Sequence, residues 1–138
     1  MKFFCFGYYD KDKFDGLAES ERHAMFDACF EYDDHLRAKG HWAGGEGLQP
    51  PHTASTVGWK NGKVAVTDGL YTDGPYTESK EQIGGILILE AQDMNQAVQL
   101  MSQHPALKYG STFEIRPVGD MSAIRKASDQ RRRQHAAR

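Results

Sequence analysis

Long hydrophobic runs and cysteines are both scarce in this chain of 138 residues. No stretch of about 18 consecutive apolar residues occurs, so a membrane-spanning helix is not expected. The two cysteines, Cys5 and Cys29, are too few for a disulfide framework, and a reducing cytoplasm is the simplest compartment. The opening stretch MKFFCF is too short and too aromatic for a signal peptide.

The sequence also lacks the short motifs that mark common cofactor and catalytic sites. It has no P-loop, no dinucleotide-binding fingerprint and no Gly-x-Ser-x-Gly elbow. His35, His41 and His52 do not show a metal-ligand spacing, such as two histidines four residues apart on one helix with a third ligand. We therefore expect neither a metal nor an organic cofactor.

The remaining composition is that of one ordinary soluble domain, with 39% apolar and 26% charged residues. The overall net charge of −2 hides an asymmetry, because residues 121–138 hold six basic residues and one acidic residue. That segment has a net charge of +5, which leaves −7 for the rest of the chain. Direct nucleic-acid binding is not expected of such an acidic body. The basic tail either contacts phosphates without specificity or is a solvated, partly helical terminus, and the second is the simpler interpretation.

Hydrophobic periodicity predicts two helices. Ser20 is a suitable N-cap for a helix that runs to about Lys39 and stops at Gly40. Asp93 caps a second helix, which Pro105 ends. One face of the first helix is expected to carry Met25, Cys29, Tyr32 and Leu36.

Extended segments surround these helices, with a first strand at residues 2–9 and a last strand at residues 112–118. Asn61-Gly62 predicts a hairpin with a type I′ turn, since both central residues of that turn need positive φ. The pairing around this turn places four apolar side chains on one face of the hairpin: Val57, Trp59, Val64 and Val66.

The order of elements is strand, helix, two or three strands, helix, strand. This order predicts a ferredoxin-like α+β fold over residues 1–119, with two helices on one face of an antiparallel sheet. The basic tail at residues 120–138 has few core-type residues and much positive charge, so we expect it to be dispensable for folding. Residues 86–89 are all apolar, as in a central strand that is covered on both sides. Helices are available for only one side, so we expect a second copy of the chain to cover the other.

Three segments resemble the DGPF branch of the YCII-related family. They are TDGPYTESKEQIGG at residues 72–85, GEGLQP at residues 45–50 and FEIRPV at residues 113–118. The resemblance extends over residues 1–118 and implies a homodimer built as a two-sheet α+β barrel. The family has no agreed general reaction, so the resemblance implies an architecture far more than a chemistry.

One departure from the family pattern is an imperfect repeat. TDGLY at residues 67–71 is followed at once by TDGPY at residues 72–76, where the family has one such unit. Five residues are therefore inserted beside the motif. The second copy carries Pro75 and the charged residues that follow, so the family motif corresponds to it. Surface loops accommodate insertions at a small entropic cost.

The motif itself is the first candidate site. In the functional interpretation, Asp73, Tyr76, Lys80 and Glu81 surround a cleft beside the barrel. In the structural interpretation, Asp73 sets a turn, and Lys80 and Glu81 form ion pairs that close the loop over the sheet. The Gly84-Gly85 pair allows a second backbone or a ligand to come close.

A second candidate is the pair Glu114 and Arg116, which alternate with Phe113 and Ile115 and so share one strand face. Arg116 can hold a carboxylate or phosphate through two parallel hydrogen bonds, and Glu46 can approach from a neighbouring strand. The alternative is a cross-strand salt bridge at the dimer interface.

The third candidate concerns a dyad. Many YCII relatives have a His–Asp pair proposed to be catalytic, with His on the first helix and Asp before a proline after the second. These positions correspond here to Cys29 and His104. The DGPF branch generally lacks the pair, so its acid–base role is not carried over. A Cys29–His104 pair is chemically feasible, because a histidine can activate a thiol, but a buried structural cysteine is more common.

Two classes of function follow from the resemblance. One is an enzyme that acts on a small anionic or polar organic molecule by general acid–base chemistry, with a lyase as the first expectation because some relatives are dehydrochlorinase-like. The other is a non-catalytic ligand-binding or regulatory protein, since DGPF relatives are often associated with sigma-factor-dependent transcription. The residues themselves leave both open.

Overall fold

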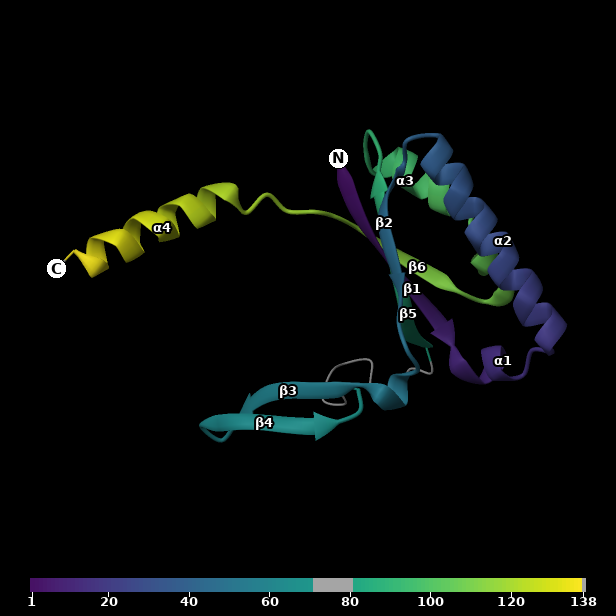
Figure 1. Cartoon of the computed structure of the whole chain (residues 1–138), viewed down its shortest axis with the longest axis horizontal. Coiled ribbons are helices and arrows are strands. Elements are labelled where there is room, and N and C mark those ends of the chain that lie inside the picture. The colour runs from purple at the N-terminus through teal and green to yellow at the C-terminus, as the bar shows by residue number, and fades with distance from the viewer. Residues whose placement is uncertain (71–80, 138) are drawn as a thin grey trace.

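A computed structural model describes residues 1–70 and 81–137. Four antiparallel strands form the main sheet in the order β2-β5-β1-β6. Their bounds are β1 Lys2–Asp10, β2 Trp42–Gly47, β5 Glu81–Glu90 and β6 Thr112–Pro117. Helices α2 (Glu19–Ala38) and α3 (Met94–Met101) lie on the same side of this sheet (Figure 1). The predicted ferredoxin-like α+β fold is confirmed.

The helix ends follow local chemistry. Asp93 caps α3 as predicted, because its carboxylate accepts a hydrogen bond of 2.8 Å from the Gln96 N–H. The predicted cap of α2 at Ser20 is wrong. The N-cap position belongs to Ala18, whose side chain offers no acceptor, and Glu21 Oε1 instead accepts the Ala18 N–H at 3.1 Å. Half of a capping box therefore suffices to begin the helix.

The core lies between the sheet and these two helices. Its buried side chains are Phe3, Cys5, Leu36, Leu87, Leu89, Ala91, Ala97 and Met101. The expected stripe on α2 is confirmed at Met25 and Leu36, which are buried, with Cys29 and Tyr32 half-buried between them. In the apolar run at residues 86–89, Leu87 and Leu89 point into this core. Ile86 and Ile88 alternate with them and are half-buried on the other face, which none of the described helices covers.

The predicted hairpin forms as expected but lies apart from the main sheet. Strands β3 (Ser55–Lys60) and β4 (Lys63–Asp68) pair with each other as a separate two-stranded sheet. Trp59 opposes Val64 and Val57 opposes Val66, and the turn residues Asn61 and Gly62 have φ of 54° and 75°. The four apolar side chains are 60–70% exposed. An isolated hairpin with an uncovered apolar face is marginally stable, so it calls for a partner surface.

Short helical segments complete the described chain: α1 Lys11–Asp15, η1 Pro51–Thr53, η2 Pro105–Tyr109 and the C-terminal helix α4 Ser122–Ala136. Both α4 and the β3–β4 hairpin project to the side of the sheet opposite α2 and α3 (Figure 1). Across the described residues, no helix is long and apolar enough to span a bilayer.

Candidate ligand site on the open sheet face

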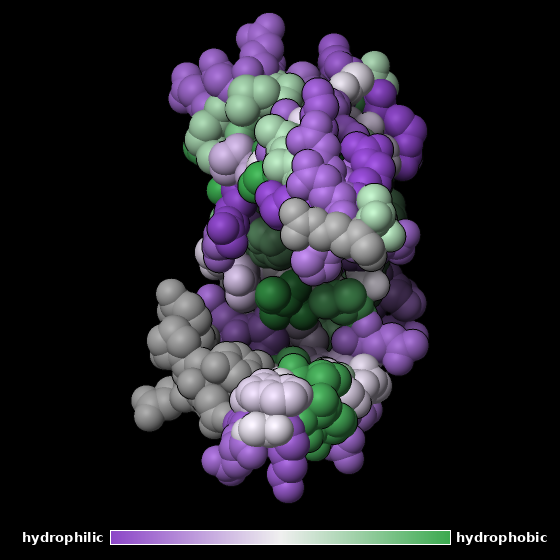
Figure 2. All heavy atoms as spheres, turned by 90° about the vertical axis from the view of Figure 1, so that its left-hand side faces the viewer, coloured by the Kyte–Doolittle hydropathy of each residue, from purple (hydrophilic) through white to green (hydrophobic). Residues whose placement is uncertain are grey.

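Strand pairing organises the uncovered face of the sheet into rows. One row runs Glu46, Ile86, Phe6 and Glu114, and the next runs Gly44, Ile88, Phe4 and Arg116, in the strand order β2, β5, β1 and β6. Side chains that are directly opposite on neighbouring antiparallel strands point to the same face. The result, called here the open face, has an apolar centre of Phe4, Phe6, Ile86 and Ile88 with charged residues at its edges. Figure 2 shows hydrophobic atoms gathered in the middle of this face and on the hairpin below it.

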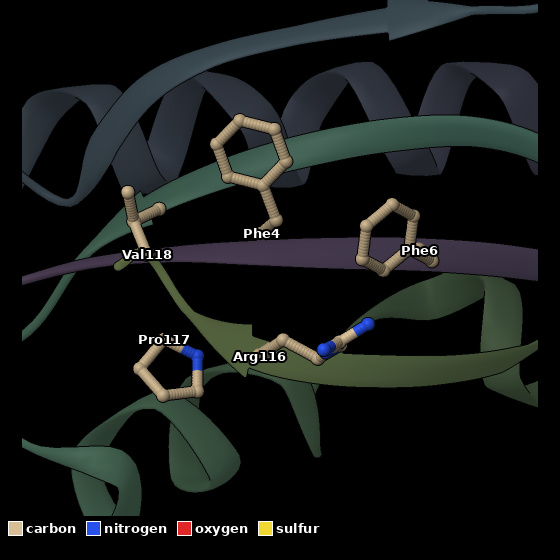
Figure 3. Close-up of a pocket in the computed structure, with 5 residues that line it drawn as sticks. All are labelled: Phe4, Phe6, Arg116, Pro117 and Val118. Carbon is tan, nitrogen blue, oxygen red and sulfur yellow. The ribbon is translucent and has the colours of Figure 1, made fainter. Parts of the chain in front are cut away.

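A shallow hollow of about 240 Å³ lies on the open face where β1 and β6 run side by side. It is called here the β1–β6 groove, and it is lined by Phe4, Phe6, Arg116, Pro117 and Val118. Figure 3 shows the Arg116 side chain lying along β6 with its guanidinium toward Phe6, while Phe4 and Val118 stand at the other end of the groove. A groove with an apolar floor and one cation suits a small organic anion.

Arg116 is the cation of this groove. It is exposed, and in the described part of the chain its guanidinium has neither a hydrogen bond nor an ion pair. Within the described part of a single chain Arg116 forms no salt bridge, and the alternative of a cross-strand salt bridge at the dimer interface stays a prediction. A guanidinium presents several N–H donors in a planar fork, which fits the oxygens of a carboxylate or phosphate.

A hydrogen-bonded tyrosine and glutamate lie beside the groove. The Tyr8 hydroxyl donates to Glu114 Oε2 at 3.3 Å, and both residues are on the open face. A phenol and a carboxylate in contact can deliver or accept a proton at a bound molecule. Sequence reasoning missed Phe4, Phe6 and Tyr8 as site residues. The sequence pattern that could have revealed them is the period-2 alternation along β1, which places them on the face opposite the buried Phe3 and Cys5.

The other predicted site residues are not brought to the groove. Glu46 shares the open face but lies three strand spacings from Glu114, about 14 Å away. Glu81 pairs with Asp10, four residues along β1 from Phe6, so it is about 13 Å from the near end of the groove. Asp73, Tyr76 and Lys80 lie outside the described residues.

His104 lies on the helical side of the sheet, away from the groove. The Ala106 N–H donates to its Nδ1 at 3.1 Å, which caps η2, and the ring packs between Tyr32 and Phe113 with centroid distances of 5.5 and 4.7 Å. Burial lowers the pKa of His104 to about 4, so the ring is neutral at pH 7. With Nδ1 occupied as an acceptor, the proton of the neutral ring sits on Nε2.

Cys29 lies in the same region between α2 and η2. Burial raises the pKa of its thiol, the Asp33 carboxylate raises it further, and a hydrogen bond from the Ala106 backbone opposes the rise. The two positions of the family dyad therefore meet around the Ala106 amide. A protonated thiol and a neutral, hydrogen-bonded imidazole favour the structural interpretation of this pair. Among residues 1–70 and 81–137, no three His, Cys, Asp or Glu side chains are grouped to hold a metal ion.

Comparison with known proteins decides the family. The model of the YCII-related domain matches residues 1–122. The chain belongs to the YCII-related family. This confirms the family resemblance seen in the sequence, while membership of the DGPF branch stays a prediction.

Two further comparisons concern individual proteins. No curated protein matches this YCII-related chain. Among solved structures it is similar to 5-chloro-2-hydroxyhydroquinone dehydrochlorinase from Burkholderia phenoliruptrix AC1100 in complex with 2,5-dihydroxybenzoquinone, at 18% sequence identity. That similarity covers 86% of this chain and 94% of the other, with a TM-score of 0.47.

Proposed function

We propose that this YCII-related protein is a homodimer that binds a small organic anion in the β1–β6 groove, with Arg116 as the anion-binding group. The observation that carries the proposal is the position of Arg116. Its exposed guanidinium has no partner in the described chain and stands directly across from Phe4 on an apolar sheet face. Such a cation gains most from a ligand that pairs an anionic group with an apolar body.

A second copy of the chain completes the site. Phe4, Phe6, Ile86 and Ile88 are half-buried, and no helix within residues 1–70 and 81–137 covers them; the apolar side chains of the hairpin are more exposed still. Packing the open face of one copy on the open face of another removes this apolar surface from water and encloses the groove, as in the α+β barrel that the family resemblance implies. The two cysteines are free, which suits a reducing compartment such as the cytoplasm.

The Tyr8–Glu114 pair supports an enzymatic version of this function. Its contact of 3.3 Å next to Arg116 supplies an acid–base couple where the ligand would bind, as a lyase requires. The non-catalytic alternative, a ligand-binding or regulatory protein linked to sigma-factor-dependent transcription, uses the same groove without proton transfer. Product formation in the presence of a bound ligand would distinguish the two.

A thermal-shift screen tests the proposal. Aromatic carboxylates and inorganic phosphate are expected to raise the unfolding temperature of the wild-type protein, because a ligand that binds the native state stabilises it by mass action. Arg116→Met should keep the stability of the free protein and lose this response. Lys108→Met, which removes an exposed cation on η2, is the matched control and should respond as the wild type does.

Two results would overturn the assignment of Arg116. If Arg116→Met keeps both full stability and full ligand response, the anion binds elsewhere. If the variant loses stability whether or not ligand is present, Arg116 is a structural residue of the subunit interface.

A further inference from the structure

Helix α4 is regular over its whole length but buries none of its side chains against its own subunit. No residue of α4 is buried, and the large apolar side chains Met121 and Ile124 at its start are 62% and 59% exposed. A helix of 15 residues is marginal in water by itself. Exposed i,i+3 and i,i+4 pairs to Asp129 contribute little to its stability. Such a helix is expected to gain its stability by docking.

The charge of α4 is strongly positive. It contains five basic residues and one acidic residue, which give Ser122–Ala136 a net charge of +4. Asp129 is held by Arg125 and Arg132. The other basic side chains have no ion pair in the described part of the chain: Lys126, Arg131 and Arg133. Arg131 follows Ile124 by seven residues and so lies on the same face of the helix.

Helix α2 has the complementary surface. Six acidic and two basic residues give Glu19–Ala38 a net charge of −4. Phe26 and Phe30 stack on its outer flank with centroids 6.3 Å apart and are 43% and 63% exposed. Asp27 directly follows Phe26, and Glu31 directly follows Phe30. Neither carboxylate has an ion-pair partner among the described residues.

We propose that α4 of one copy docks on α2 of another copy of this chain. The apolar pair Met121 and Ile124 then covers Phe26 and Phe30, and the free basic side chains of α4 meet Asp27 and Glu31. The net charges of the two helices are equal and opposite, so their pairing neutralises both. In its own subunit α4 extends away from α2, on the opposite side of the sheet (Figure 1), so the acceptor is a second copy.

The dimensions permit this exchange within a dimer. Helix α4 is about 22 Å long at 1.5 Å per residue. Two sheets that pack face to face lie about 10 Å apart, and a helical layer lies about the same distance beyond the second sheet. An arm that leaves the edge strand β6 toward the open side therefore reaches the helical layer of the partner.

Two other occupants fit less well. A helix that lies on a membrane presents a broad face of large apolar residues, whereas Ile124 is the single large aliphatic side chain within α4. A nucleic acid would meet the net charge of −7 on the rest of the chain. Helix α2 of a second copy offers carboxylates to the basic side chains of α4 and exposed phenylalanine rings to its apolar side chains.

Charge-swap variants of the full chain test the inference by sedimentation equilibrium. The first variant combines Arg131→Glu and Arg133→Glu, which reverses two of the unpaired basic side chains, and the second combines Asp27→Lys and Glu31→Lys. Each is expected to weaken self-association at least tenfold, because like charges then face each other across the contact. An equimolar mixture, or one chain carrying both sets, should recover the wild-type association constant. A variant with glutamine at the same two arginine positions is the control, and its association constant should fall between those of the wild type and the charge-reversal variant.

Far-UV circular dichroism keeps this test independent of folding, since all variants should show the wild-type spectrum. The inference is wrong if either charge reversal leaves association unchanged, or if the swapped pair does not recover it. Loss of binding to anionic vesicles or to duplex DNA by the first variant, with self-association intact, would assign α4 to that partner instead. Truncation after Asp120 should weaken association as the first variant does.

Discussion

Gly85 lies so close to the backbone of Glu46 that a Cβ atom on Gly85 would stand 3.0 Å from the Glu46 carbonyl oxygen. Strands β2 and β5 pair at this point, where Gly47 opposes Gly85. The predicted role of the Gly84-Gly85 pair, the close approach of a second backbone, is therefore confirmed for Gly85. Its φ is not positive, so space alone requires the glycine.

Gly85→Ala should consequently destabilise the protein. The new methyl group meets a backbone atom that cannot rotate away, so we expect a loss of about 1–3 kcal/mol in the free energy of unfolding. Urea denaturation measures this loss. Gly58→Ala is the matched control, since Gly58 is also in a strand and nothing lies within 4 Å of its added Cβ. That control should be neutral or slightly stabilising. Equal losses in both variants would contradict the steric explanation.

Stability should fall in mild acid because of His104. Its pKa is about 4 in the folded protein and near 6.5 when exposed, so the unfolded chain binds the extra proton first as pH falls. The stabilisation is complete above pH 6.5 and is lost between pH 6.5 and 4, by up to about 3 kcal/mol.

His104→Asn separates this effect from packing. Asparagine keeps an acceptor for the Ala106 N–H but does not titrate. We expect the variant to be less stable at pH 7, because its smaller side chain packs less fully on Tyr32 and Phe113. Its free energy of unfolding should change less than that of the wild type between pH 6.5 and 4. A variant with the same acid sensitivity as the wild type would show that another group is responsible.

Both thiols should react slowly in the native protein. Burial raises the pKa of Cys5 to about 12 and also raises the pKa of Cys29, so little reactive thiolate forms at pH 8. We expect Cys29, which is half-buried, to be modified by a disulfide reagent faster than Cys5 and slower than a free cysteine. Cys29→Ala identifies its share of the signal. Modification of Cys29 faster than a free thiol would indicate that His104 activates it.

The protein is expected to be a dimer whose interface buries more than about 2,000 Å² in total. The uncovered apolar sheet face and the exposed apolar side of the β3–β4 hairpin motivate this prediction. Light scattering over about a hundredfold dilution should detect no folded monomer. A stable monomer at all concentrations would leave the β1–β6 groove open to solvent and remove the second copy from the proposed site.

Local patterns in the sequence determined where several turns, helix caps and strands of this protein form. The Asn61-Gly62 turn, the cap at Asp93 and the alternation that sets Arg116 apart from Ile115 depend on torsion angles and on neighbours a few residues away. A pattern of this kind is complete within a short window, so this turn, this cap and the sheet face of Arg116 could be predicted.

Only the tertiary structure decided which of these residues meet. Glu46 and Arg116 share the open face but are separated by β5 and β1, His104 lies on the other side of the sheet, and the hairpin stays outside it. Strand order follows from long-range pairing and from which surfaces can bury each other, and no local window contains that information. For the same reason, the sequence predicted an exposed basic tail, and the fold revealed that its helix extends away from the acidic helix of its own subunit.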